Sequence, residues 1–290
     1  HLIVQDTDGR MKPINTYASE LLRKLSKKDS YNGFDANQVF LSMQESPQLW
    51  YNVPLIYLKA KKADTIRTIL GLKKTAKYAA LVDFLNPNLD YKLGPYLEDA
   101  YSAQIPTAIQ KIFKETDQRV SLLFNTLEGN ALRIYPIPDD ENNTWVSSKE
   151  FRERDYILKD SLYGNFIKTG FIAYLATLQN DKALNTDFSK SQQLLEAIKA
   201  TQTKFGRSTT ISQDKVEAEI LYNRYDIFKK LFEYYMYASS LMFLLLIVQI
   251  FKDRSTVLYY SVQVFNLGLF WSSYAWFNNS MVYFRPCPLE

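Results

Sequence analysis

The sequence predicts a mainly α-helical protein with a few short strands, in which an extracytoplasmic helical domain is followed by two transmembrane helices. Three observations predict this class. Apolar residues recur at helical spacing over much of the chain. An Asp-Gly pair near the start favours a β-hairpin, and two long uncharged stretches lie near the end. With 290 residues, 47% of them apolar, the chain can bury a sizeable core.

The chain opens with a predicted β-hairpin. Residues 2–5 suit a strand, Asp8 and Gly9 form a favoured tight-turn pair, and residues 10–12 return as the second strand. Pro13 ends that strand, because proline has no backbone N–H to continue the ladder.

Helices are expected after the hairpin. Either Asn15 or Thr16 offers a side-chain oxygen as N-cap of the first helix. Its apolar face repeats at spacings of four, through Tyr17, Leu21 and Leu25. The next expected elements are a helix over 35–45 capped by Asp35, a strand or extended segment over 53–58, a helix over 65–70 ended by Gly71, and a helix over 75–85.

The most regular helical pattern covers residues 107–128. Pro106 precedes it and Gly129 follows it, as is typical of a helix start and stop. The remaining expected elements are a strand over 131–135, a helical stretch over 148–179 with a break near Gly164, a helix over 188–205 ended by Gly206, and a helix from Asp214 into strongly apolar sequence.

Two uncharged stretches near the end favour transmembrane helices. Residues 234–251 would span roughly 27 Å as a helix, close to a hydrocarbon core of about 30 Å. Residues 257–277 are the most apolar part of the second stretch. A buried pair of core helices is the alternative, but neither stretch shows a polar face. The turn at 252–254 carries two basic residues, which favours the cytoplasm for the turn and the outside for the N-terminal domain.

The expected organisation follows from these elements. It comprises an extracytoplasmic helical domain over 1–212, an amphipathic connecting helix over 213–233, transmembrane helices over 234–251 and 257–277, and a tail over 278–290. The chain does not begin with Met and ends in Pro-Leu-Glu, so we expect a segment of a longer protein with a truncated or altered tail.

The composition excludes several kinds of chemistry. Cys287 is the only cysteine and His1 the only histidine, so an internal disulfide, a Cys/His zinc site and an internal Ser-His-Asp set are impossible. A net charge of +4, with the basic residues dispersed among acids, does not indicate nucleic-acid binding. The acid pairs Glu217/Glu219 and Asp139/Asp140 leave an enzyme as a weaker hypothesis.

The opening hairpin is the first candidate site. Asp6 and Asp8 before Gly9 resemble the start of a calcium loop, but Arg10 and Lys12 would repel a cation. Two interpretations stay open. In one, the Asp-Gly pair only makes a turn, with Asp6 and Arg10 paired across it.

In the other interpretation, the hairpin forms a partner-binding surface. Its residues would be Asp6, Arg10, Lys12 and Asn15. A second group of partner-binding candidates lies on the connecting helix and consists of Glu217, Asn223 and Arg224.

A family resemblance enters with the stretch LIVQDTDGRMKPINTYASELLRKLSKKD. It resembles a segment of the fused system II cytochrome c biogenesis proteins of Bacteroidetes, which join CcsB/ResB-like and CcsA/ResC-like parts. The pieces NVPLIYLK, ALRIYPI with Trp145, and VEAEILYNRYDIFKKLF fit the same pattern more loosely. In this family such a segment begins an extracytoplasmic region.

The resemblance implies a part of a machine that delivers haem and attaches it to apocytochrome c. The family's Trp-Trp-Asp haem segment with flanking histidines is absent, since Trp271 and Trp276 have no such Asp or His beside them. Haem b is therefore expected in the full-length protein and not on this segment, where His1 is the one conceivable ligand. The segment would be a docking or scaffold domain and an anchor, without catalytic residues.

The resemblance also implies partners and a location. The expected partners are apocytochrome c or other cytochrome c maturation components, together with membrane lipid, and the expected location is the inner membrane with the N-terminal domain in the periplasm. The alternative is a membrane-anchored extracytoplasmic binding or scaffold domain unrelated to haem, which composition and periodicity support equally.

Overall fold

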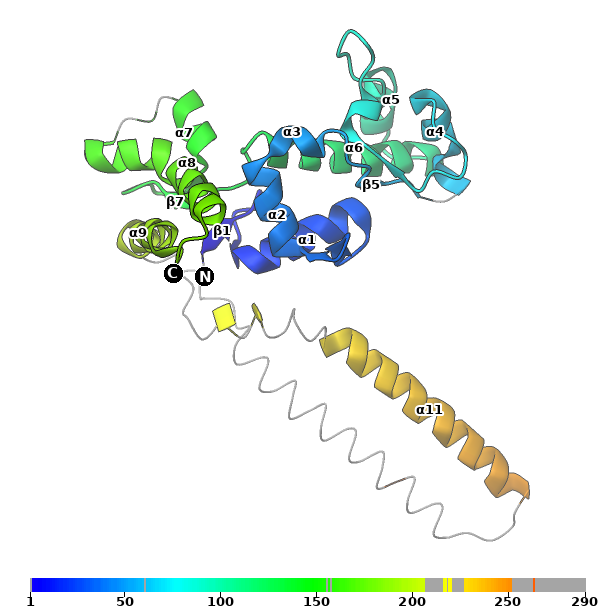
Figure 1. Cartoon of the computed structure of the whole chain (residues 1–290). Helices are drawn as coiled ribbons and strands as arrows, with labels where there is room; N and C mark the ends of the chain where they lie inside the picture. Colours follow the sequence, from blue (N-terminus) through cyan, green and yellow to red (C-terminus); the bar gives the residue numbers. More distant parts are fainter. Residues whose placement is uncertain are drawn as a thin grey trace. The chain divides into compact units, whose positions relative to one another are not determined.

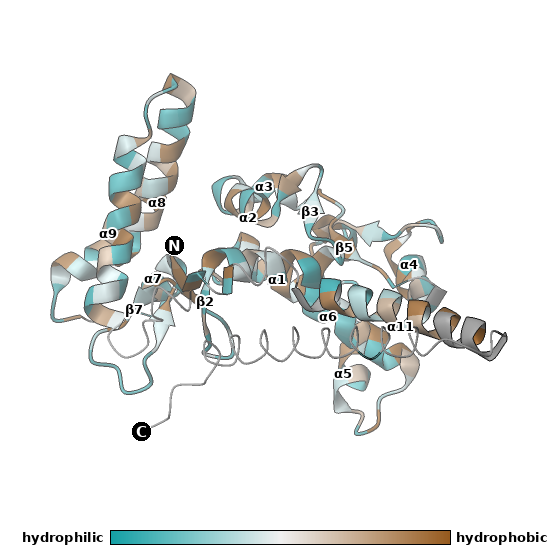
Figure 2. Cartoon of the chain, turned by 90° about the horizontal axis from the view of Figure 1, so that it is seen from below, coloured by the Kyte–Doolittle hydropathy of each residue, from teal (hydrophilic) through white to brown (hydrophobic). Residues whose placement is uncertain are grey.

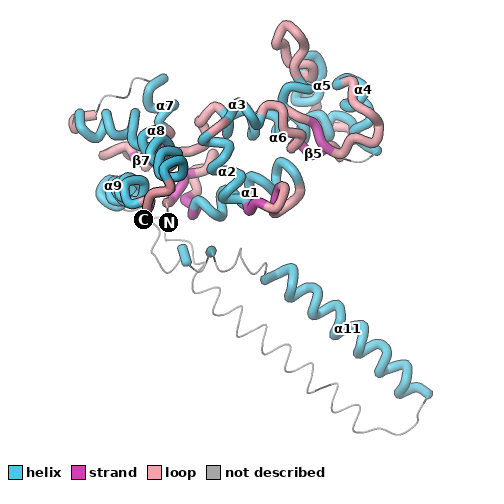
Figure 3. The backbone as a smooth tube through the Cα atoms, viewed as in Figure 1, coloured by secondary structure: helices cyan, strands magenta, loops and turns pink. Residues whose placement is uncertain are grey.

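A computed structural model describes residues 2–59, 61–154, 156, 158–206, 216–217, 219–220, 227–251 and 263 (Figure 1). The chain divides into two compact units, His1–Thr210 and Ile211–Glu290. The described part is mainly helical with short strands, as Figure 3 shows by its colours.

The first unit contains most of the described elements. Its α-helices are α1 Ile14–Ser26, α2 Ala36–Glu45, α3 Pro47–Trp50, α4 Asp64–Leu70, α5 Gly94–Ser102, α6 Ala108–Leu127, α7 Ser148–Glu153, α8 Ser161–Leu184 and α9 Ser189–Gly206. Two 3₁₀ turns are η1 Lys61–Ala63 and η2 Leu81–Phe84. In the second unit, α11 covers Ile227–Phe251.

The described strands form four antiparallel pairs of two strands each. The pairs are β1 Ile3–Gln5 with β2 Met11–Pro13, β3 Ser30–Tyr31 with β4 Phe34–Asp35, β5 Ile56–Tyr57 with β6 Tyr78–Ala79, and β7 Tyr135–Pro136 with β8 Trp145–Val146. The predicted N-terminal hairpin is therefore present, with Gly9 at a positive φ of 81° that suits glycine.

The first unit has two lobes, each built around a long helix. In one lobe α6 packs against α1, α2 and α5, and in the other α8 packs against α7 and α9. Figure 2 shows hydrophilic and hydrophobic residues alternating along α8 and α9, as expected for helices with one buried and one exposed face. The lobes share one hydrophobic core, which includes Leu22, Leu123 and Ile167.

Helix starts encoded by short-range signals are where the sequence places them. Asp35 caps α2, accepting from the backbone N–H of Gln38 while the Gln38 side chain accepts from the Asp35 N–H. The same reciprocal pair forms between Thr107 and Gln110 at the start of α6. Each pair satisfies two backbone donors that a helix start leaves without partners.

Three helix predictions need correction. The first helix begins at Ile14, with Pro13 at the N-cap and no side-chain cap, so Asn15 and Thr16 lie inside the helix. The predicted break near Gly164 is wrong, because Gly164 lies within α8, and α7 ends earlier, at Glu153.

The predicted helix over 75–85 is also wrong. Its backbone instead pairs with β5, where Ala79 lies opposite Ile56, and then turns through η2. Pairing places Ala79, Leu81 and Phe84 in the core, all at most 3% exposed. Burial against a strand that is distant in sequence has overridden local helical periodicity.

In the part of the chain that the structure describes, no helix has the length and apolar character needed to cross a membrane. This finding corrects the prediction of two transmembrane helices. Residues 234–251 belong to α11, whereas 257–277 lie outside the described residues except for Gln263.

Candidate functional site

The opening hairpin is held together by the charged residues that the sequence singles out. The Asp6 carboxylate accepts from the backbone N–H groups of Asp8 and Arg10, both at 2.9 Å, and pairs with the Lys12 ammonium group at 2.7 Å. Lys12 also pairs with Glu20 on α1 at 2.7 Å. The predicted Asp6–Arg10 contact includes a bond from the Arg10 backbone N–H to the Asp6 carboxylate.

This network shifts the acidity of its members. Burial raises the pKa of Asp6, but the Lys12 hydrogen bond and the two backbone N–H groups lower it more, so the net shift is downward. Burial lowers the pKa of Lys12, and its two carboxylate partners outweigh that effect and raise it. Both side chains are about nine-tenths buried, at 11% and 8% exposed.

The network gives Asp6 and Lys12 an internal role in the hairpin. Arg10 is exposed and Asn15 is half-buried. Partner binding by these four residues stays a prediction. Among the other candidates, Glu217 is an exposed helical residue, whereas His1, Asn223 and Arg224 lie outside the described residues.

Two buried glutamines, which sequence reasoning missed, fix the hairpin to the rest of the unit. The Gln5 side chain accepts from the Trp145 backbone N–H at 2.7 Å and donates to the Asn143 carbonyl at 3.1 Å. The Gln202 side chain accepts from the Ile3 N–H at 3.1 Å and donates to the Ile3 and Ile134 carbonyls, both at 2.9 Å.

The free edge of β1 explains why these glutamines are needed. A two-stranded pair leaves backbone groups without partners on its outer edge, and burying them unpaired is costly. Gln202 pairs those of Ile3, and the Arg133 carbonyl accepts from the Gln5 N–H at 3.0 Å. No local sequence signal marks such a glutamine, because its partners are distant along the chain.

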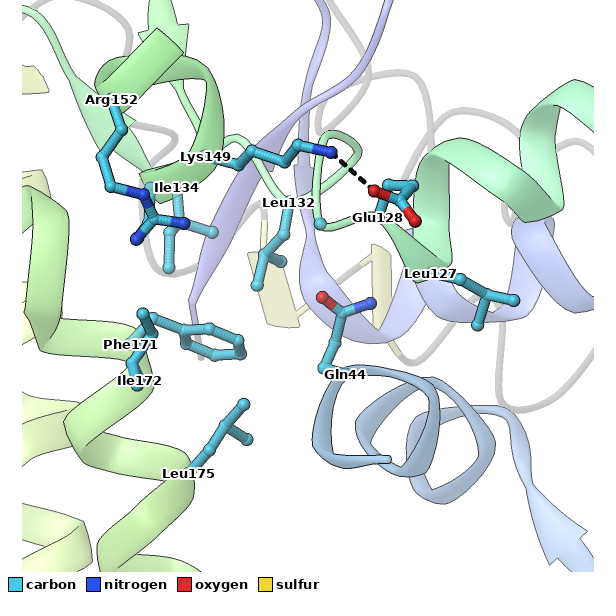
Figure 4. Close-up of a pocket in the computed structure, with 12 residues that line it drawn as sticks. Gln44, Leu127, Glu128, Leu132, Ile134, Lys149, Arg152, Phe171, Ile172 and Leu175 are labelled. Atoms are coloured by element: carbon cyan, nitrogen blue, oxygen red, sulfur yellow. Dashed lines mark hydrogen bonds and ion pairs between the residues drawn. The ribbon is translucent and has the colours of Figure 1, made fainter. Parts of the chain in front are cut away.

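A pocket lies where the two lobes of the first unit meet, and it is the best candidate for a binding site (Figure 4). Its volume is about 190 Å³. The apolar part of the lining comes from the end of α6, the segment after it and one face of α8: Leu127, Leu132, Ile134, Phe171, Ile172 and Leu175.

The polar side of the pocket is formed by Gln44 and by the first turns of α7. Lys149 reaches across to Glu128 at 2.7 Å, as the dashed line in Figure 4 marks, and also lies 3.8 Å from Glu153. Arg152 donates to the Lys168 carbonyl at 3.1 Å. The Gln44 amide donates to the Thr126 carbonyl at 3.0 Å, which ties α2 to the end of α6.

The carboxylate of Glu128 is fixed in its charged form. It accepts from Lys149 and from the Tyr51 hydroxyl, both at 2.7 Å, and these two bonds lower the pKa of Glu128. Burial and this carboxylate together raise the pKa of Tyr51 to about 12. At neutral pH the pocket edge therefore carries a paired Glu128–Lys149, and the Tyr51 phenol, outside the lining, stays neutral.

Two buried hydroxyl groups near the pocket lack partners among the described residues. They are the Ser148 hydroxyl, which belongs to the pocket lining, and the Tyr135 hydroxyl, which does not. Burial raises the pKa of Tyr135. The neighbouring Ser148 hydroxyl lowers the pKa of Tyr135 by a smaller amount. The two hydroxyl groups do not, however, have the geometry of a hydrogen bond with each other.

The pocket lining does not suit a metal or haem. It includes no histidine, cysteine or methionine, the side chains that ligate haem iron in most proteins. Within the described residues, no group of three acidic, His or Cys side chains is placed to hold a metal ion.

Comparison with known proteins gives one informative similarity. No protein-family model matches the chain. The protein named NrfI of Wolinella succinogenes is 31% identical over 250 residues, which is 84% of this chain. The chain spans only 26% of the length of NrfI. The similarity supports the predicted relationship to cytochrome c biogenesis proteins.

Proposed function

We propose that this chain is a docking or scaffold part of a cytochrome c maturation protein and that the pocket between the lobes receives a partner. The similarity to NrfI supports a part in cytochrome c maturation, and the pocket is the observation that supports docking. An apolar floor with charged groups at its edge is the usual composition of a protein-binding site.

The proposed partners are apocytochrome c or another maturation component. Haem b is proposed for the full-length protein, at a site other than this pocket, because the lining has no side chain of the usual axial-ligand types. A location outside the cytoplasm is proposed as well. It is supported by the proteins that the opening motif resembles, in which such segments are extracytoplasmic.

The test is haem attachment in cells that depend on the full-length protein. Ile172 lines the pocket and is 51% exposed, so Ile172→Glu should place a charge on the pocket surface without removing core packing. Leu184 lies on the same helix outside the pocket lining and is 74% exposed, so Leu184→Glu is the matched control. Immunoblotting is used to check that wild type and both variants are present at equal levels.

We expect Ile172→Glu to reduce haem-stained c-type cytochromes at least about tenfold and Leu184→Glu to leave them unchanged. Normal staining with both variants would refute the docking role of the pocket. If cells that lack the whole protein still assembled c-type cytochromes, the alternative of a scaffold unrelated to haem would replace this proposal.

A further inference from the structure

We infer that the pocket binds a peptide segment of a partner protein through one large apolar side chain, with a neighbouring carboxylate held by Arg152. This inference rests on the proposed docking function and names the chemistry of the partner. Three features of the described residues support it: the volume of the pocket, the distribution of its charges and the unpaired hydroxyl group of Ser148 in its lining.

The volume selects a single side chain as the occupant. Pockets for drug-sized ligands and cofactors usually measure about 300–1,000 Å³. This pocket measures about 190 Å³, close to the roughly 150 Å³ of an engineered cavity that binds benzene. It therefore fits one Phe-, Leu- or Met-sized side chain. The ring of Phe171 and the branched side chains of Leu175 and Leu132 form an apolar wall for it.

The charges at the pocket edge favour an acidic residue in the peptide, close to its apolar side chain. Lys149 already has Glu128 at 2.7 Å, so its charge is largely compensated. Arg152 is exposed, and no carboxylate of a described residue lies within ion-pair distance of it. A guanidinium group has five N–H donors, and the contact to the Lys168 carbonyl uses one of its nitrogens. The others can bind a carboxylate in the two-pronged geometry that arginine favours.

The unpaired Ser148 hydroxyl favours a peptide over a simple hydrocarbon as the occupant. The Ser148 hydroxyl, within the lining, is buried without a partner among the described residues. An occupant that supplies a backbone N–H or carbonyl would satisfy it, and such satisfaction is the rule for buried polar groups. The Gln44 side chain also lines the pocket, and its amide nitrogen already donates to the Thr126 carbonyl (Figure 4). Its amide oxygen offers a further acceptor for an extended backbone.

The test is selection of random twelve-residue peptides displayed on phage against the full chain. We expect enrichment of peptides in which Phe, Leu or Met is followed within two positions by Asp or Glu. For a selected peptide made synthetically, changing the apolar anchor to Ala or the acid to its amide should weaken binding at least about tenfold, as measured by fluorescence anisotropy.

Reversing the charges of Arg152 and of the peptide carboxylate tests whether Arg152 binds the peptide or only supports the fold. With Arg152→Glu, binding of the acidic peptide should fall at least about tenfold, and a peptide with Lys in place of the acid should regain most of it. Lys199→Glu, on the exposed face of α9, is the matched control and should change neither peptide. Peptides without an apolar–acidic pair, or an Arg152→Glu variant that behaves like the control, would overturn the inference.

The peptide experiments and the cytochrome c assembly experiment can fail independently of each other. If the expected peptides are selected but Ile172→Glu leaves cytochrome c assembly normal, the peptide site stands and the maturation role falls. If Ile172→Glu abolishes assembly but no such peptides are selected, docking stands and the peptide chemistry is wrong. Selected peptides whose sequences match a segment of this chain would replace the partner by a second copy.

Discussion

Replacing Gln202 with Leu should destabilise the first unit more than almost any other single polar substitution. The side chain is 4% exposed and makes three hydrogen bonds, two to Ile3 and one to Ile134. Leucine is of similar size but has no donor or acceptor. The substitution therefore leaves one N–H and two carbonyl groups of the backbone buried without partners.

The magnitude follows from the number of groups left unpaired. Each buried backbone group without a partner costs about 1–3 kcal/mol. Three such groups give about 3–9 kcal/mol, and the apolar burial of leucine offsets part of it, so we expect a loss near 3 kcal/mol. Because whole domains are stable by only about 5–15 kcal/mol, this is a large fraction of the total.

The assay is urea unfolding of the chain, followed by far-ultraviolet circular dichroism. With a slope of about 2 kcal/mol per molar urea, a 3 kcal/mol loss lowers the unfolding midpoint by about 1.5 M. Gln193→Leu is the matched control, because Gln193 is an exposed residue of the same helix, and its effect should stay within about 0.5 kcal/mol. If both variants shifted the midpoint equally, the hydrogen bonds of Gln202 would not have the role assigned to them.

Two further predictions concern the α8 glycines and the hairpin network. Gly170→Ala should lower the free energy of unfolding by about 1–2 kcal/mol, because the new methyl group would lie 3.1 Å from the Phe166 ring. Gly164→Ala should raise the free energy of unfolding by about 0.5–1 kcal/mol, because its new methyl group has its nearest contact at 3.8 Å and alanine favours the helix. Urea unfolding of both variants checks the opposite signs, and equal signs would contradict the packing argument. Because the pKa of Asp6 is lowered in the folded state, its contribution to stability is complete above the unfolded value of about 3.9 and is lost as the pH falls through the folded value. The melting temperatures of wild type and Asp6→Asn should therefore converge between pH 4 and 2, and a constant difference over that range would refute the assigned role.

Sequence reasoning succeeded where a structure is determined by neighbours along the chain. Asp35 predicted the start of α2 and Pro106 that of α6, because both signals lie within a few residues of the helix that they start. It failed at residues 75–85, where the pairing of Ala79 with Ile56 decides the conformation. Periodicity describes one segment at a time and cannot show that a distant strand competes for its backbone.

The pocket was beyond sequence reasoning for the same reason. Its lining combines Gln44 from α2, Lys149 from α7 and Leu175 from α8, and nothing in those local sequences links them. The hairpin was conspicuous because its charges are close together in sequence, yet the structure uses Asp6 and Lys12 to hold two strands and α1 together. Charges that compensate each other within a fold have little left for a partner. For that reason Arg152, which no described carboxylate compensates, is the better place to look for recognition.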